Sequence, residues 1–172
     1  MKDTSLINKT LLQNANNDLY MKMLGIEITE ISSGYAKAKM KVTKEICNPY
    51  NSVHGGCLFS LADITAGYAA CAYGHYVSTV SGNMNYIKPA MNTNYIYCIG
   101  EVVRQGKQIS VYNVELFDIN YSPALAVANV SISMKDSSDL ARKVSDISLL
   151  SSNLEDLVTL KKLSTALKNC LK

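Results

Sequence analysis

The residues best suited to chemistry lie in one stretch of the chain, from residue 48 to residue 74. A polar turn leads into His54-Gly55-Gly56, and a helix is predicted from about Gly55 to Tyr73, with Asp63 as its single acid. A carboxylate in so apolar a helix is costly to bury unless it is paired, hydrogen-bonded or used in a reaction. Glycines at a helix start leave backbone N–H groups that can meet an oxyanion. A carboxylate, an oxyanion hole and a polar loop containing Asn48 suit acyl transfer to water, and an acid that only caps or pairs is the alternative.

The spacing of these groups predicts how they can act together. Gly55 and Asp63 are eight positions apart on one helix, which places them about 12 Å apart at the helical rise of 1.5 Å per residue. Both groups must lie within about 3 Å of the reacting atoms to serve one carbonyl. If they act together they come from different chains, and we therefore expect a two-subunit site.

Periodicity on either side of this helix predicts the rest of the fold. A helix is expected over about residues 6–23, followed by a hairpin from Ile26 to Thr43 with lysines on its wet face. Four more strand-like runs follow the central helix, over residues 77–88, 94–104, 108–118 and 124–134. Short connections imply antiparallel neighbours. The fold class is therefore α+β: an antiparallel sheet of about six strands wrapped around one long central helix, with extra N- and C-terminal helices.

The run from residue 108 to residue 118 alternates unevenly. Asn113 and Glu115 fall on the same side as Val111 and Phe117. A β-bulge explains this pattern, and so does a sheet with both faces partly used.

Composition fits a single globular unit. The chain has 172 residues, of which 48% are hydrophobic and 18% charged, with a net charge of +3 spread along its length. This argues against a nucleic-acid surface, and no apolar run reaches the roughly 20 residues of a membrane span. The first residues carry no apolar signal segment, and five cysteines without metal-like spacing indicate free thiols in a reducing cytoplasm.

Two regions are expected along the chain. Residues 1–138 form the main domain, with a core over about 25–134, and residues 139–172 form a C-terminal extension. The extension carries a capping box from Ser152 to Glu155 and a leucine stripe beyond it, which predict an amphipathic helix over about 152–171. This helix is expected to pack on the sheet or on another subunit.

Three segments resemble a known family. They are His54-Gly55-Gly56-Cys57-Leu58-Phe59-Ser60-Leu61-Ala62-Asp63, Ser81-Gly82-Asn83-Met84-Asn85-Tyr86-Ile87-Lys88-Pro89-Ala90 and Gly106-Lys107-Gln108. They are similar to the signature of the hotdog-fold thioesterases, in the phenylacetate-pathway (PaaI-like) branch of the 4-hydroxybenzoyl-CoA thioesterase superfamily. The resemblance covers roughly residues 25–134. It implies a homodimer, commonly paired into a tetramer, that hydrolyses acyl-CoA thioesters with no metal or organic cofactor.

The resemblance also implies roles for single residues. Asp63 matches the catalytic carboxylate, acting as general base on water or as nucleophile forming an anhydride. Gly55 matches the amide of the oxyanion hole, with Gly56 alongside, and His54 and Asn48 match the residues that position the thioester and water.

Substrate contacts are implied along the subunit junction. Lys88 and the turn from Arg104 to Lys107 are expected near the CoA phosphates, and Ser81 lies in a matched segment. Thr65 is a further candidate, with a helix threonine that bonds back to its own backbone as the alternative.

Alternatives to the hydrolase remain at this point. One is a non-catalytic acyl-CoA-binding module, which needs no buried carboxylate. Another is an enoyl-thioester hydratase or dehydratase, in which His54 pairs with the Asp63 of a second chain. Cys57, at the start of the helix, is either a reactive thiolate or a buried thiol.

Overall fold

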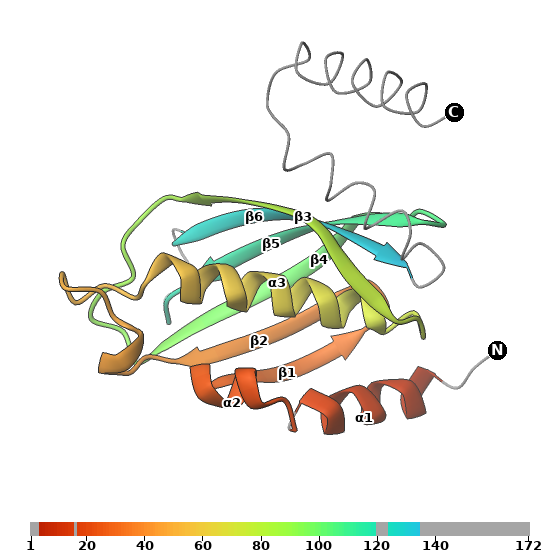
Figure 1. The fold of residues 1–172 in the computed structure, drawn as a ribbon, viewed down its shortest axis with the longest axis horizontal. Helices are drawn as coiled ribbons and strands as arrows, with labels where there is room; N and C mark the ends of the chain where they lie inside the picture. Colours follow the sequence, from red (N-terminus) through yellow and green to blue (C-terminus); the bar gives the residue numbers. More distant parts are fainter. Residues whose placement is uncertain (1–3, 16, 120–123, 135–172) are drawn as a thin grey trace, which may run out of the picture.

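The computed structural model describes residues 4–15, 17–119 and 124–134 (Figure 1). The predicted amphipathic helix over 152–171, the boundary after residue 138 and Cys170 lie outside these residues. No helix in the described part of the chain is long and apolar enough to cross a membrane.

The main feature is one antiparallel sheet of six strands, which confirms the predicted α+β class. Its strands in spatial order are β1 (Ile26–Ser32), β2 (Tyr35–Lys41), β4 (Tyr95–Arg104), β5 (Ile109–Phe117), β6 (Ala126–Met134) and β3 (Val77–Tyr86). Every neighbouring pair is antiparallel. β3 is therefore an edge strand although it lies in the middle of the chain.

Alternation along the strands separates a core face from an outer face. In β2, Ala36, Ala38 and Met40 are buried, while Lys37 and Lys39 lie on the outer face and form ion pairs with glutamates of β1 at 3.3 and 2.9 Å. Such exposed pairs contribute little to stability, because water screens them. The hairpin is therefore held mainly by its apolar face.

The uneven pattern of residues 108–118 comes from a sheet that uses both faces. β5 alternates regularly between buried and half-buried residues, and the nearby register shift lies on β4, between Val102 and Arg104. The half-buried Asn113 accepts a hydrogen bond from Asn129 at 3.3 Å and donates one to Glu115 at 3.4 Å. A polar row therefore runs across the outer face.

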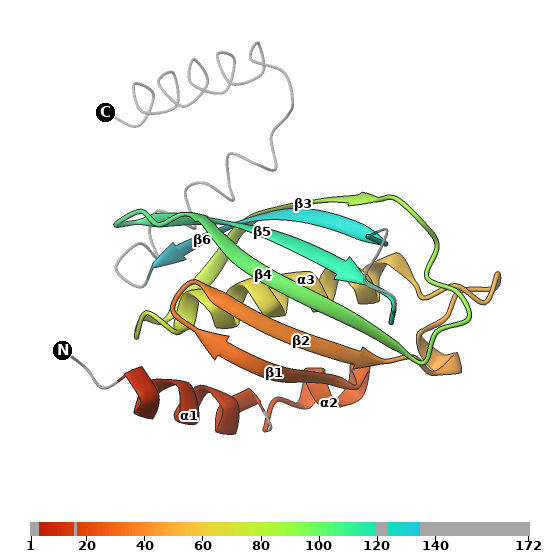
Figure 2. The same ribbon diagram turned by 180° about the vertical axis from the view of Figure 1, so that it is seen from behind.

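The helix α3 (Gly55–Cys71) lies across the core face and contacts all six strands (Figures 1 and 2). It ends two residues before the predicted Tyr73, with Ala72 as its C-cap. Small residues let the helix approach the sheet closely: a Cβ on Gly100 of β4 would lie 3.3 Å from the Thr65 side chain. The sheet curves around this helix, as its small residues predict.

The single predicted helix over 6–23 is wrong, because the chain forms two helices there. α1 spans Thr4–Ala15 and α2 spans Leu19–Leu24. Asp18 begins the second helix by accepting hydrogen bonds from the N–H groups of Tyr20 and Met21 at 2.8 and 3.0 Å. Both helices pack along β1 at the sheet edge opposite β3 (Figure 1).

Candidate active site

One backbone donor in the first turn of α3 has no acceptor within the part of the chain that the structure describes. His54 is the N-cap, and its Nδ1 accepts a hydrogen bond from the Gly56 N–H at 3.1 Å. Its carbonyl accepts from the N–H groups of Cys57 and Leu58 at 2.9 and 3.3 Å. Among the described residues, no acceptor meets the Gly55 N–H. These bonds polarise the His54–Gly55 peptide and strengthen its N–H as a donor at the positive end of the helix dipole.

The roles of the two glycines therefore differ. Both were expected to offer their amides to an oxyanion, but the Gly56 amide is engaged by His54. Because Nδ1 accepts this bond, it carries no proton, and the imidazole presents Nε2 to solvent as its N–H. Of the two amides, that of Gly55 has no acceptor among the described residues, which keeps it as the candidate oxyanion donor.

Asn48 shapes the loop that leads to the helix. Its Oδ1 accepts hydrogen bonds from the N–H groups of Tyr50 and Ser52 at 2.9 and 3.2 Å. The loop is then tied back by a bond from the His54 N–H to the Ile46 carbonyl at 2.8 Å. The acceptor atom of Asn48 is thus used within the turn, and the side chain positions His54 and the helix start through the backbone.

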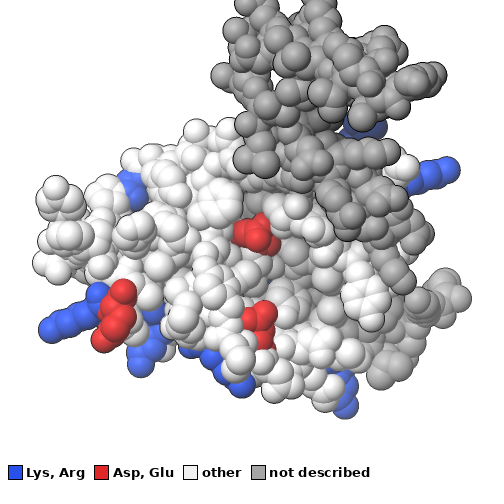
Figure 3. Space-filling view, viewed as in Figure 1, with Lys and Arg blue, Asp and Glu red and all other residues white. Residues whose placement is uncertain are grey.

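Asp63 is half-buried and is oriented by a residue of the edge strand. The Thr79 hydroxyl of β3 donates a hydrogen bond to Asp63 Oδ1 at 2.7 Å. In the described part of the chain, no group donates to Oδ2, which leaves one carboxylate oxygen for a water or a substrate. In the view with α3 in front, acidic groups appear among uncharged atoms near the middle of the face, with basic groups mainly along its rim (Figure 3).

The strand β3 runs antiparallel to α3 and keeps the two candidate groups apart. Tyr86, at the end of β3, donates a hydrogen bond from its hydroxyl to the Gly55 carbonyl at 3.1 Å, while Thr79 near its start reaches Asp63. Because α3 is one uninterrupted helix from Gly55 to Cys71, Gly55 and Asp63 are about 12 Å apart along it. A single chain does not bring the amide and the carboxylate to one carbonyl.

Ser81 lies on the other face of β3. Its neighbour Gly82 faces α3, because a Cβ on Gly82 would lie 2.8 Å from the Phe59 ring. Successive strand residues point to opposite faces. Ser81, a candidate for substrate binding, therefore points away from Asp63, and Thr79 is the hydroxyl residue of β3 beside the carboxylate.

Thr65 faces the sheet core. It is fully buried, and its hydroxyl donates to the Leu61 carbonyl at 2.6 Å. This geometry matches the alternative of a helix threonine that bonds back to its backbone.

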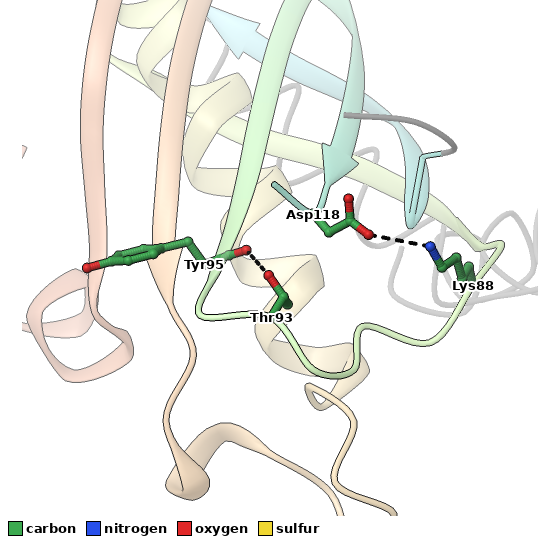
Figure 4. Close-up of polar contacts among 4 residues, drawn as sticks. All are labelled: Lys88, Thr93, Tyr95 and Asp118. Carbon is green, nitrogen blue, oxygen red and sulfur yellow. Dashed lines mark hydrogen bonds and ion pairs between the residues drawn. The ribbon is translucent and has the colours of Figure 1, made fainter. Parts of the chain in front are cut away.

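The basic candidates lie at opposite ends of the sheet. Lys88 follows β3 and reaches Asp118, just after β5, with Nζ 3.4 Å from Oδ2 (Figure 4). Arg104 and Lys107 flank the turn at the other end of β5, which spans nine residues, or about 27 Å. One chain does not gather the three cations around one ligand.

A pocket of about 340 Å³ opens beside the helix start. Its walls come from the loop before α3, from α3 itself, and from the end of β3 and the segment after it. It is lined by Ser52, Val53, Gly55, Leu58, Tyr86, Ile87, Lys88, Pro89 and Ala90.

The cysteines within the described residues are free thiols. Burial raises the pKa of the Cys57 thiol, with a further contribution from Cys47. Burial likewise raises the pKa of Cys98 to about 12. Cys57 is half-buried, and its raised pKa argues against a reactive thiolate although the residue lies at a helix N-terminus.

Two residues of the site were missed in the sequence analysis, Thr79 and Tyr86. Nothing in the type or spacing of Thr79 distinguishes it from the other hydroxyl residues of its strand. Tyr86 lies in a segment quoted for its family resemblance, but its contact with Gly55 depends on where β3 ends over the helix.

The fold and the site define a class of protein, the hotdog-fold thioester hydrolases. Residues 50–120 match the thioesterase superfamily. The chain is 35% identical over 108 residues to the acyl-coenzyme A thioesterase PaaI of Escherichia coli, a match that covers 60% of this chain and 77% of that protein. It is 24% identical over 102 residues to 1,4-dihydroxy-2-naphthoyl-CoA thioesterase 2 of Arabidopsis thaliana, covering 58% of this chain and 65% of that protein.

A solved structure agrees with these matches. The E. coli PaaI protein from the phenylacetic acid degradation operon superimposes with a TM-score of 0.68 at 29% identity, covering 75% of this chain and 96% of that one. The chain belongs to the hotdog-fold thioesterase superfamily, in its PaaI-like branch. It is a thioester hydrolase. This finding favours the hydrolase over the two alternative hypotheses, a hydratase and a non-catalytic binding module.

Proposed function

We propose that this chain hydrolyses the thioester of an acyl- or aryl-CoA to a free acid and CoA, with Asp63 and the Gly55 amide as its catalytic groups. The observation that carries the proposal is the free Gly55 N–H at the start of α3, on the same helix as a carboxylate whose Oδ1 is held by Thr79. The similarity to an acyl-coenzyme A thioesterase supports acyl-CoA as the substrate class.

The active site is completed by a second copy of the chain. No described strand pairs with the outer edge of β3, and a row of unpaired backbone groups at a sheet edge is a template for another strand. If two β3 edges pair antiparallel about a two-fold axis, the Thr79 end of one strand lies beside the Tyr86 end of the other. The axis then passes near Gly82 and Asn83, and each Asp63 moves toward the Gly55 of the other copy.

A dimer is therefore the smallest active unit in this proposal. Pairing of two dimers into a tetramer is compatible with it and adds nothing to the chemistry. The reaction uses water and the two protein groups, so we propose that it needs no cofactor beyond the CoA of the substrate.

In the first route, Asp63 acts as general base. Its carboxylate takes a proton from water while the water oxygen attacks the thioester carbonyl carbon. The carbonyl oxygen becomes an oxyanion, which accepts a hydrogen bond from the Gly55 N–H. The intermediate collapses, the carbon–sulfur bond breaks, and the CoA thiolate leaves as the carboxylic acid forms. The proton held by Asp63 then passes to the thiolate or to solvent.

In the second route, Asp63 is the nucleophile. A carboxylate oxygen attacks the carbonyl carbon, expels the CoA thiolate and forms a mixed anhydride, which water then hydrolyses. A single turnover in oxygen-18 water identifies the anhydride route if the heavy oxygen enters the protein, whereas attack of water on the acyl side of the anhydride labels the acid product, as the general-base route does. Entry into the protein requires attack of water on the Asp63 side of the anhydride.

CoA phosphate binding by Lys88, Arg104 and Lys107 together requires two chains, because one chain separates them. Charge reversal at Lys107 and, separately, at Lys88 tests this. A rise in KM for acyl-CoA, with KM for a short acyl-pantetheine unchanged, marks a residue that meets the phosphates.

A panel of acyl-CoAs with a free-thiol reagent tests the proposed function as a whole. Acyl groups should range from acetyl to long-chain and aromatic. Release of stoichiometric thiol with at least one class is the expected result. Binding of several acyl-CoAs without thiol release from any of them contradicts the proposal.

A further inference from the structure

The pocket beside Gly55 can hold one of the two substituents of a bound thioester. Gly55 lines the pocket. If the carbonyl oxygen of a thioester accepts a hydrogen bond from the Gly55 N–H, either the acyl group or the sulfur arm of that thioester therefore lies next to the pocket. The two arms differ in chemistry. The acyl arm can be pure hydrocarbon, whereas the pantetheine arm carries two amide groups that need hydrogen-bond partners when buried.

The pocket walls offer few such partners. Most of the lining is apolar, from Val53, Leu58, Ile87, Pro89 and Ala90. The polar side chains are those of Ser52, which is largely buried, Lys88, whose ammonium is paired with Asp118, and Tyr86, whose hydroxyl is bonded to the Gly55 carbonyl. Two amide groups placed here would lose their hydrogen bonds to water and would find few partners in the protein. A hydrocarbon group makes no such hydrogen bonds and loses none.

One side chain of the pocket wall, that of Tyr86, lies against the helix start. The hydroxyl of Tyr86 is bonded to the Gly55 carbonyl, and a Cβ on Gly55 would lie 3.3 Å from atoms of the Tyr86 ring. The ring is thus held against the backbone that bears the oxyanion donor. The same side chain is 55% exposed, so it forms a wall rather than part of the core.

We propose that this pocket takes the acyl group of the substrate, an aryl or medium-length hydrocarbon group, and that Tyr86 sets its size limit. This inference rests on the proposed acyl-CoA hydrolysis. The pocket volume of about 340 Å³ lies at the small end of the range of about 300–1,000 Å³ for ligand pockets. It accommodates one or two rings, or a chain of similar bulk. Tyr86 is a specificity-determining residue here, not a catalytic one.

The test widens and narrows the pocket by single substitutions. Tyr86→Ala removes the wall, and Tyr86→Phe keeps the wall but removes the hydroxyl. Ile87→Trp narrows the pocket from a side chain that is 59% exposed, so it is compatible with folding. Val103→Trp is the matched control, because Val103 is 66% exposed on β4 near the opposite end of the sheet.

The readout is a ratio of kcat/KM values for 2-naphthoyl-CoA and benzoyl-CoA. Tyr86→Ala should raise this ratio about tenfold or more, since small volume changes in an apolar pocket alter selectivity by about 10–200-fold. Ile87→Trp should lower it by a similar factor, and Tyr86→Phe and Val103→Trp should leave it unchanged. If Tyr86→Ala does not fold, the Ile87→Trp result alone decides.

Two other outcomes overturn the inference. One is an unchanged ratio in both Tyr86→Ala and Ile87→Trp. The other is an Ile87→Trp variant whose KM rises equally for every acyl-CoA but does not rise for acyl thioesters of N-acetylcysteamine. That result assigns the pocket to the pantetheine arm. In either case the wild-type protein still hydrolyses acyl-CoAs. Failure of the proposed function itself is recognised separately, as a wild-type protein that hydrolyses none of them.

Discussion

Replacing Asp63 by asparagine isolates the proposed chemical role of its carboxylate. Asparagine has nearly the same shape, and its Oδ1 can still accept the hydrogen bond that Thr79 donates at 2.7 Å. The side chain is only half-buried on a continuous helix, so no cavity or unpaired buried charge results. What is lost is the ability to take a proton from water or to attack the carbonyl.

We expect Asp63→Asn to lower kcat by about 10²–10⁴-fold, the usual contribution of positioned acid–base catalysis. This corresponds to about 2.7–5.4 kcal/mol of transition-state stabilisation. KM should change little, because Asp63 is not expected to hold the substrate in its ground state. Thiol release from the best acyl-CoA, followed under saturating conditions, measures kcat.

Glu27→Gln is the matched control for this variant. It makes the same change of charge at an exposed β1 residue that pairs with Lys39 at the far edge of the sheet, and it should leave kcat unchanged. An Asp63→Asn protein that keeps more than about a tenth of the wild-type rate refutes the assignment of Asp63 as base or nucleophile.

Four further predictions follow from single contacts. Gly55→Pro removes the proposed oxyanion donor at a helix position that tolerates proline. Its kcat should fall about 10²–10³-fold. The Gly55→Ala control keeps the N–H, and its kcat should fall less. Thr79→Val should lower kcat about 2–10-fold through loss of one hydrogen bond to Asp63, with recovery in Thr79→Ser; equal rates in all three would make the contact incidental. Asn48→Ala should lower the free energy of unfolding by about 1–2 kcal/mol, since two N–H groups lose their acceptor, whereas Asn48→Asp keeps it; chemical denaturation distinguishes them. Cys57→Ala should retain wild-type activity, and because burial raises the pKa of its thiol, less thiolate is present at pH 8 and alkylation should be slower than for a free cysteine.

The fold was predictable because its signals are local and repeated. Alternation over β2 and the change to small and apolar residues over α3 indicate elements, and short connections imply antiparallel pairing. The break before α2 was missed because the periodic apolar positions continue through it. What starts α2 as a separate helix is the side chain of Asp18, which accepts hydrogen bonds from backbone donors of its first turn.

The candidate site was predictable where residue type alone carries the chemistry. Asp63 and Gly55 stand out by composition, and the helical rise separates them whatever the rest of the chain does. Thr79 was not predictable, because strict alternation places Thr79 and Ser81 on the same face. A register shift between them instead puts Thr79 and Gly82 toward the helix, and a one-residue shift moves every later side chain to the other face.

The occupied Gly56 amide was missed for a related reason. Histidine is not among the residues that usually cap helices, so the bond from the Gly56 N–H to His54 Nδ1 gives no signal in the sequence. The separation of Lys88 from Arg104 and Lys107, by contrast, could have been predicted, because two antiparallel strands such as β3 and β4 finish at opposite ends of a sheet.

The central claim is that one active site uses Gly55 of one chain and Asp63 of another, and complementation between two inactive variants tests it most directly. Asp63→Asn and Gly55→Pro chains are co-expressed with different tags, and thiol release is measured on the mixed protein. In a two-fold dimer, half of the dimers are mixed and each has one intact site, so about a quarter of wild-type activity per chain should return. Activity no higher than that of the two variants measured separately would contradict a shared site.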